Sequence, residues 1–306
     1  MDAMKENGTI QFEPREDTVH KITESAKSLL MKGTCTPAEA AKLRGTASWA
    51  AGNTFGRMAR LGLRALKSRQ YQKENTVELD EPLLMGLRFL VETLPELGPR
   101  STRILGPTPK PTVVYSDASW PENMTAEEAV DRGEPPRLGW VIFTPGEKPR
   151  GFSLELGKEF TSILFPRKTQ ILAAEAVAVL TALVLTPELL EGKEMVWFVD
   201  NEAALSSLIR GASKAEDVGH IAASTQLAMM EHSCAAWFEW IDSDSNPSDG
   251  LSRDGIRDLW TVRQGWDLTE IRPEEFTKVA EYLSHEKVVR ITGLAPKGPV
   301  LPSETG

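Results

Sequence analysis

The chain of 306 residues is poor in cysteine and lacks any long apolar segment. Its only cysteines are Cys35 and Cys234, which excludes a disulfide framework or a cysteine-based zinc site and suits a reducing compartment. The N-terminal stretch MDAMKENGTIQFEPRED has no apolar centre and does not resemble a secretory signal. The most apolar stretch, 171–185, is shorter than a membrane span and contains Glu175. We therefore expect a soluble intracellular protein of the cytoplasm or nucleus, with no membrane partner.

Net positive charge is also lacking, since the formal net charge is −9. Such a balance argues at first against a nucleic-acid partner. The distribution is uneven, however, because residues 40–73 contain eight Lys or Arg and no acid. A helix would present four of these on one face, at spacings of three and four: Arg57, Arg60, Arg64 and Lys67. Contact with phosphates and a simple solvated face both remain open, although solvated faces usually mix signs.

Residues 1–100 have the pattern of an all-α domain. The sequence Thr36-Pro37-Ala38-Glu39 is a capping box with proline at the first helical position. Two acids, Asp17 and Asp80, are candidate starts for helices that extend to 32 and 94, and the basic helix is expected from about residue 53. Residues 101–112 are rich in Pro, Gly and Thr and predict a linker.

From residue 113 the periodicity changes to that of an α/β domain. Three short β-type runs predict an antiparallel meander, interrupted by a partly helical insertion at 120–137. Helical and strand patterns then alternate through residue 254. This order predicts a mixed five-stranded sheet flanked by helices. We expect strands at 113–119, 137–143, 151–157, 194–200 and 235–241, helices at 168–185, 202–211 and 217–234, a C-terminal helical extension at 255–290, and a disordered tail at 291–306.

Four carboxylates follow one another as Asp117, Glu175, Asp200 and Asp249. Three of them interrupt apolar runs, where an ionised side chain is costly unless it is paired. Asp117 and Asp200 end strands, and such ends meet at one edge of an α/β sheet. A divalent cation would relieve their mutual repulsion, and oxygen ligands suit Mg²⁺ or Mn²⁺. The set predicts a catalytic site with two metal ions.

Taken singly, each of these acids has an ordinary structural explanation. Asp117 could be a turn residue, Asp200 a helix N-cap, and Glu175 a buried paired or solvent-facing acid. It is the ordered set on this pattern of strands and helices that favours a functional interpretation.

Five motifs in the same order resemble a type-1 ribonuclease H domain fused to retroelement reverse transcriptases, with DIRS-like elements as the nearest kin. They are SDAS, LGW, AAEA, VDNEAAL and NPSDGLSR, all within 113–253. The segment 35–66 also resembles the thumb or connection region of such proteins. The resemblance implies a ribonuclease H-like fold and hydrolysis of the RNA strand of an RNA–DNA hybrid.

The same resemblance implies roles for individual residues. Asp117 would bridge two Mg²⁺ or Mn²⁺ ions, with Glu175 and Asp200 completing the first site and Asp249 the second. Ser119 and Asn201 lie close to these acids in the sequence and are candidate nucleic-acid contacts. So are Arg57, Arg60, Arg64 and Lys67, which are called the basic stripe below. Asn246 is interpreted as a turn-former that orients the last acid.

The sequence also departs from the family pattern. It lacks a Tyr-x-Asp-Asp motif, so polymerase activity is not expected and a polymerase would act from another domain or subunit. No histidine precedes Asp249 in its loop, and His232 is the nearest substitute. Residues 113–253 hold eleven basic and twenty-two acidic side chains, which keeps open a catalytically inactive retroelement-derived binding or assembly module. A 3′–5′ exonuclease would need Glu in place of Ser119, and an integrase would need the order Asp, Asp, Glu.

Overall fold

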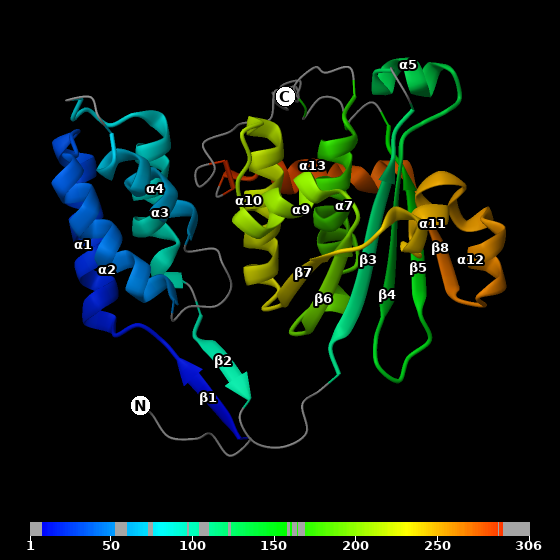
Figure 1. Ribbon diagram of the computed structural model, residues 1–306, viewed down its shortest axis with the longest axis horizontal. Helices are drawn as coiled ribbons and strands as arrows, with labels where there is room; N and C mark the ends of the chain where they lie inside the picture. The colour runs from blue at the N-terminus through cyan, green and yellow to red at the C-terminus, as the bar shows by residue number, and fades with distance from the viewer. Residues whose placement is uncertain are drawn as a thin grey trace, which may run out of the picture. The chain divides into compact units, whose positions relative to one another are not determined.

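A computed structural model describes most of the chain (Figure 1). The described residues are 8–52, 60–72, 76–96, 98–103, 110–121, 124–157, 160, 164, 169–286 and 288–289. The chain separates into two compact units, one within Met1–Lys110 and the other formed mainly by Pro111–His285.

The described part of the first unit contains four α-helices, and two of them begin as the sequence predicts. At the start of α2 the Thr36 backbone N–H donates to Glu39 Oε2 over 2.8 Å, and the Glu39 N–H donates to Thr36 Oγ1 over 3.2 Å, which confirms the capping box. At the start of α4 the side chain of Asp80 accepts from the Leu83 N–H over 3.0 Å. The helices are α1 (Glu16–Lys32), α2 (Pro37–Gly52), α3 (Arg60–Gln70) and α4 (Glu81–Glu92), with the 3₁₀ turn η1 (Leu94–Glu96).

The first unit also contains β structure, so the prediction of an all-α domain was wrong here. Strand β1 (Thr9–Phe12) pairs antiparallel with β2 (Arg100–Arg103), which spans the boundary between the predicted helical domain and the predicted linker. These strands gain their stability from pairing across some ninety residues of sequence, which local propensity does not reveal. Helix α1 is preceded by Arg15 as its N-cap, and Asp17 lies in its first turn instead of capping it.

A six-stranded mixed sheet forms the second unit, in the order β7-β6-β3-β4-β5-β8. The first three strands in sequence form the predicted antiparallel meander, and β6 and β7 extend it in parallel from β3. The prediction of a mixed α/β sheet flanked by helices is confirmed. The strands are β3 (Thr112–Ser119), β4 (Arg137–Phe143), β5 (Arg150–Glu155), β6 (Glu194–Val199), β7 (Ala235–Trp240) and β8 (Asp267–Ile271).

The sixth strand, β8, corrects the predicted five-stranded sheet and the predicted helical extension. It pairs in parallel with β5 at the edge of the sheet. Its sequence DLTEI is short and mostly polar, and it is largely exposed, so no apolar pattern marks it as a strand. The pairing with β5 supplies what the local sequence does not.

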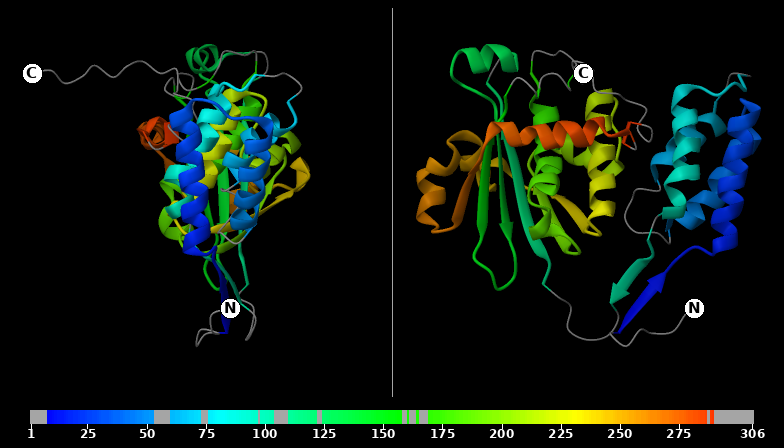
Figure 2. Two further views of the ribbon diagram at one scale, coloured as in Figure 1. Left: turned by 90° about the vertical axis from the view of Figure 1, so that its left-hand side faces the viewer. Right: turned by 180° about the vertical axis from the view of Figure 1, so that it is seen from behind.

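One face of the sheet is covered by the longer helices, with α13 running across it in the view from behind (Figure 2). Helix α7 is buried all round because it packs against β3 and β4 on one side and against α9, α10 and α13 on the other. No helix among the described residues combines the length and apolar character needed to cross a membrane. The helices are α7 (Ile171–Leu185), α8 (Pro187–Leu190), α9 (Glu202–Arg210), α10 (Glu216–Glu231) and α13 (Phe276–Ser284).

Short helices and 3₁₀ turns lie over part of the opposite face of the sheet and within the connecting loops. The one-turn helix α11 lies over β3, β4 and β5, and it is the element that matters for the site. The predicted insertion carries a short capped helix, α5, as expected. The bounds are α5 (Ala126–Asp131), η2 (Ser243–Ser245), α11 (Asp249–Arg253), η3 (Gly255–Arg257), α12 (Leu259–Arg263) and η4 (Pro273–Glu275).

Candidate metal centre

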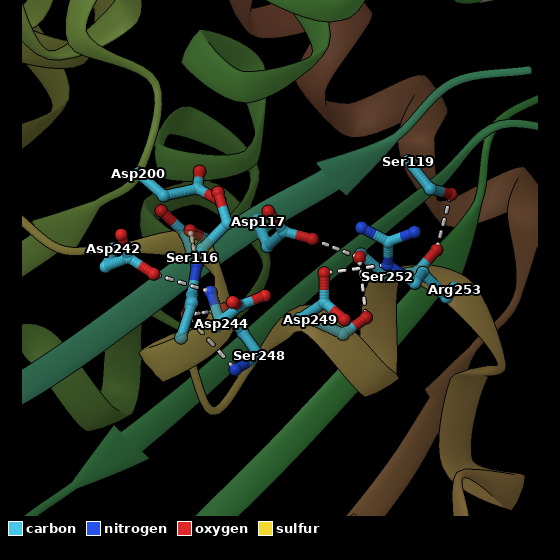
Figure 3. Close-up of polar contacts among 12 residues, drawn as sticks. Ser116, Asp117, Ser119, Asp200, Asp242, Asp244, Ser248, Asp249, Ser252 and Arg253 are labelled. Carbon is cyan, nitrogen blue, oxygen red and sulfur yellow. Dashed lines mark hydrogen bonds and ion pairs between the residues drawn. The ribbon is translucent and has the colours of Figure 1, made fainter. Parts of the chain in front are cut away.

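Two of the predicted acids are brought level by the register of parallel strands. Ser116 of β3 pairs with Val199 of β6, so the residues that follow them, Asp117 and Asp200, meet at one edge of the sheet. The buried apolar residues of both strands fix this register, because a slip by one position would turn them out of the core. The close-up shows both carboxylates at this edge (Figure 3).

Glu175 joins them from the covering helix. It is the fifth residue of α7 and only 4% exposed, which excludes the solvent-facing alternative. Its carboxylate also accepts a hydrogen bond from the backbone N–H of Ala118. One carboxylate oxygen from each of Asp117, Glu175 and Asp200 lies within 4.8 Å of the other two.

Crowding three carboxylates in a buried place makes their charges costly. Burial, and then the charge of Asp200, raises the pKa of Asp117 to about 7, against the opposing effect of a hydrogen bond from Ser252. Burial, and then the charges of Asp117 and Asp200, raises the pKa of Glu175 well above its ordinary value. The site is therefore a concentration of negative charge, which the nearby Arg253 offsets only in part by lowering the pKa of Asp117.

The donor set fits a divalent cation. Glu175 Oε2 and Asp200 Oδ1 are buried and have no hydrogen-bond partner among the described residues. Such orphaned oxygens are expensive unless a further group satisfies them. Carboxylate oxygens converging in this way are the ligands that Mg²⁺ and Mn²⁺ prefer.

Asp249 is not part of this close group. It begins α11, and its Oδ1 accepts from Arg253 Nε over 2.7 Å. Its charge still reaches the site, where it contributes to the raised pKa of Asp117. The structure thus brings three of the four predicted ligands within reach of one ion and leaves the fourth beside them, paired with Arg253.

Asn246 has the turn-forming role that the sequence predicted. Its carbonyl oxygen accepts from the Asp249 N–H over 3.1 Å, and its side-chain amide donates to Ser116 O over 3.2 Å. Its Oδ1 accepts from the hydroxyl of Ser248 over 2.6 Å. The residue is buried and ties the segment before α11 to strand β3.

Asp200 is held by residues that precede this turn. Ser243 Oγ donates to Asp200 Oδ2 over 2.8 Å, and the indole N–H of Trp240 donates to the Asp200 carbonyl over 3.0 Å. His232, by contrast, precedes β7 and lies at the opposite end of the strands from Trp240. The suggested role of His232 beside Asp249 was wrong, because strand β7 separates His232 from the edge of the sheet at which the acids lie.

The sequence did not single out Ser252, although it lies in the motif NPSDGLSR. Its hydroxyl is buried and donates to Asp117 Oδ2. Gly139 of β4 makes this approach possible, since a Cβ there would lie 2.5 Å from Ser252 N and 2.8 Å from Ser248 O. Gly139 had no predicted role beyond the LGW motif, because its contact with Ser252 joins residues more than one hundred positions apart.

Two of the predicted nucleic-acid contacts, Ser119 and Asn201, form hydrogen bonds within the chain. Ser119 Oγ donates to the carbonyl of Ser252 over 2.5 Å. Asn201 caps α9, where its Oδ1 accepts from the N–H groups of Ala203 and Ala204 over 3.1 and 3.0 Å. Their proposed contact with nucleic acid stays a prediction.

Only part of the basic stripe falls within the described residues. Arg64 and Lys67 are exposed on α3, and Arg60 is the first residue of that helix, whereas Arg57 lies outside the described residues. Arg69, in the same acid-free segment, is 2% exposed and donates to the carbonyls of Thr76 and Glu78. It is therefore a structural cation and not part of a surface.

Comparison with known proteins identifies no family. No protein-family model matches the chain, and no curated protein matches its sequence. Among solved structures the chain is similar to a ribonuclease H1 from the halophilic archaeon Halobacterium salinarum NRC-1, at 11% identity and a TM-score of 0.32, over 48% of this chain and 98% of that one. A likeness this distant carries no argument about function, so the case depends on the chain's own residues.

Proposed function

We propose that the chain is a metal-dependent nuclease of ribonuclease H type, which hydrolyses the RNA strand of an RNA–DNA hybrid with two Mg²⁺ or Mn²⁺ ions. The observation that carries this proposal is the group of Asp117, Glu175 and Asp200, which offer one oxygen each within 4.8 Å of one another. Two buried oxygens of the group, Glu175 Oε2 and Asp200 Oδ1, also lack a hydrogen-bond partner among the described residues. The motif order of the sequence supplies the substrate class.

The residues of the chain have distinct tasks in this proposal. Asp117, Glu175 and Asp200 would hold the cations, and Asp249 would be the further ligand beside them. When bound, the ions supply an activated water and stabilise the leaving oxygen. Ser243 fixes the side chain of Asp200 by its hydrogen bond, so that this carboxylate needs little reorganisation on binding. The hybrid would be recognised by its backbone shape and its 2′-hydroxyls.

Affinity for the hybrid would come largely from outside the second unit, which carries the acids and is called the catalytic unit below. Residues 113–253 carry twice as many acidic as basic side chains, so they attract phosphate poorly. The proposed phosphate contact is the basic stripe, of which Arg60, Arg64 and Lys67 lie on α3. The sequence motifs also support an origin in a retroelement polyprotein, with a polymerase domain or subunit acting in trans.

The proposal is tested with purified protein and a hybrid labelled on its RNA strand. Cleavage should require Mg²⁺ or Mn²⁺ and should be lost in Asp200→Asn, which removes the charge and keeps the size. Asp244→Asn is the matched control, since it removes one acid from the exposed loop next to the site and outside the close group. Equal cleavage by Asp200→Asn and the parent protein would reject the proposed mechanism.

The second candidate is a non-catalytic binding or assembly module, which the acidic charge of the catalytic unit favours. It predicts hybrid binding without metal-dependent cleavage, by the parent protein and Asp200→Asn alike. A binding measurement beside the cleavage assay therefore separates the two candidates.

A further inference from the structure

Serine hydroxyls attach the one-turn helix α11 to the open face of the sheet. Ser153 of β5 donates to the Leu251 carbonyl over 2.9 Å, and Ser119 of β3 donates to the Ser252 carbonyl over 2.5 Å. Ser252 itself donates back to Asp117 of β3. The first two bonds fix the backbone of α11, whereas the third, which Figure 3 shows between Ser252 and Asp117, reaches the candidate metal centre.

Ser252 lies between the first and the fourth acid. Its Oγ is close to Asp117 Oδ2 and is 2.8 Å from the carbonyl oxygen of Asp249. The side chain is fully buried, so water does not replace either contact. Among the described residues no other side chain donates a hydrogen bond to Asp117. The orientation of this carboxylate therefore depends on one hydroxyl.

We propose that Ser252 is a positioning residue for the metal centre, which holds the Asp117 carboxylate in the orientation that binds the cation and keeps the segment of Asp249 against it. This inference rests on the proposed function, because it assigns a task within the same site. It follows from the general behaviour of metal ligands, whose hydrogen-bonded neighbours fix their direction and contribute to affinity.

Ser153 offers a matched control. It is also a fully buried serine whose hydroxyl bonds to α11, but it contacts a backbone carbonyl and Arg137 and no carboxylate of the site. Replacing either serine by alanine removes one buried hydroxyl and one bond between α11 and the sheet. Only the change at Ser252 removes the partner of Asp117.

The experiment uses the full chain and compares the parent protein with Ser252→Ala and Ser153→Ala. Binding of Mn²⁺ is measured by electron paramagnetic resonance without nucleic acid, and cleavage of hybrid is measured against Mg²⁺ concentration. Ser252→Ala should weaken Mn²⁺ binding by about 10–100-fold, as the loss of a hydrogen-bond partner of a metal ligand typically does. The Mg²⁺ concentration that gives half-maximal cleavage should rise by a similar factor. The KM for hybrid at saturating Mg²⁺ should stay that of the parent, and Ser153→Ala should bind Mn²⁺ like the parent.

Each other outcome overturns the inference in a recognisable way. Unchanged Mn²⁺ binding in Ser252→Ala, with a parent that binds and cuts, removes the role of Ser252 alone. Equal weakening by both alanine variants assigns the effect to the docking of α11. A parent that neither binds Mn²⁺ nor cuts hybrid removes the proposed function as well. If circular dichroism shows Ser252→Ala unfolded, Ser252→Cys keeps the volume with a weaker donor, and affinity equal to that of the parent then refutes the inference.

Discussion

Asp117 of β3 lies directly opposite Gly139 of β4 in the antiparallel register of the sheet. Because Gly139 has no side chain, the backbone of α11 can pack against β4 next to Asp117. A Cβ at Gly139 would lie 2.5 Å from Ser252 N and 2.8 Å from the backbone carbon of Leu251. These are backbone atoms, so no flexible side chain can move aside. The geometry of the candidate centre thus depends on a residue that contributes no ligand.

Gly139→Ala is therefore expected to displace α11 and to destabilise the second unit. Overpacking of this kind costs about 1–3 kcal/mol, measurable by denaturant unfolding. Affinity for Mn²⁺ should fall together with stability, because Ser252 and Asp249 move with the helix. Gly45→Ala is the control, since it lies in α2 with nothing within 4 Å of the added Cβ and should be neutral or slightly stabilising. Parent-like stability of Gly139→Ala would contradict the close approach.

Asp200→Asn should make the metal-free protein more stable. Its charge raises the pKa of both Asp117 and Glu175, so its removal relieves repulsion that exists only in the folded state. A gain on the order of 1 kcal/mol is expected, about the equivalent of one pKa unit. The melting temperature in EDTA checks it, and the variant should also lose the rise that Mg²⁺ gives the parent. A loss of stability in EDTA would indicate that Asp200 is instead held by favourable contacts.

Without metal, the raised pKa values of Asp117 and Glu175 should make the stability of the fold decrease as pH rises. Asp117 has a folded pKa of about 7 against an ordinary 3.8, so the folded chain binds its proton more tightly than the unfolded chain does. Its contribution is fully present below the ordinary value and is lost as pH rises towards 7. Added Mg²⁺ should therefore raise the melting temperature more at pH 8 than at pH 5. A larger shift at pH 5 would contradict the raised pKa.

His220 titrates in the opposite sense and must be separated from this effect. Burial lowers the pKa of His220 to about 4, so its contribution to stability is lost as pH falls from its ordinary 6.5 towards 4. The imidazole Nε2 lies 2.9 Å from the carbonyl of Leu283 on α13, away from the acids. Since Mg²⁺ does not touch this residue, the difference between curves with Mg²⁺ and with EDTA cancels its contribution and isolates that of the acids.

The sequence predicted those parts of the fold whose pattern is local. Apolar runs located the strands β3 to β7 and helix α7, and the ends of two such runs located Asp117 and Asp200. The parts it missed depend on partners far away in the chain. Strand β8 is polar and exists through β5, and β1 exists through β2.

The candidate site shows the same division. Glu175 was predictable because an acid inside an apolar helix has few acceptable surroundings. The pairing of Asp249 with Arg253 is an i, i+4 contact within α11, and it was missed because no helix was expected there from the sequence. Ser252 was missed because serine is common in loops, and only the space left by Gly139 gives it a buried carboxylate as a partner.

The final prediction concerns the basic stripe of the first unit. If it contacts the phosphates of the hybrid, neutralising Arg60, Arg64 and Lys67 to glutamine should weaken binding to every sequence alike. Each lost contact should reduce the slope of log affinity against log salt by roughly 0.7–0.9. Adding Arg57→Gln tests the whole predicted set. Binding of Mn²⁺ should be unchanged, because the acids belong to the other unit.

A second triple variant in the same unit distinguishes contact from general charge. Lys21, Lys27 and Lys32 are each paired with an acid, at 3.7, 2.9 and 2.9 Å, so their conversion to glutamine makes the same change in net charge. Phosphate contact by the stripe predicts a reduced slope for the first variant and a nearly unchanged slope for the second, since counterions are released only where side chains meet phosphates. Equal effects would assign the result to overall charge. No effect of either variant would mean that the stripe is a solvated face, and hybrid binding would then have to arise within the catalytic unit.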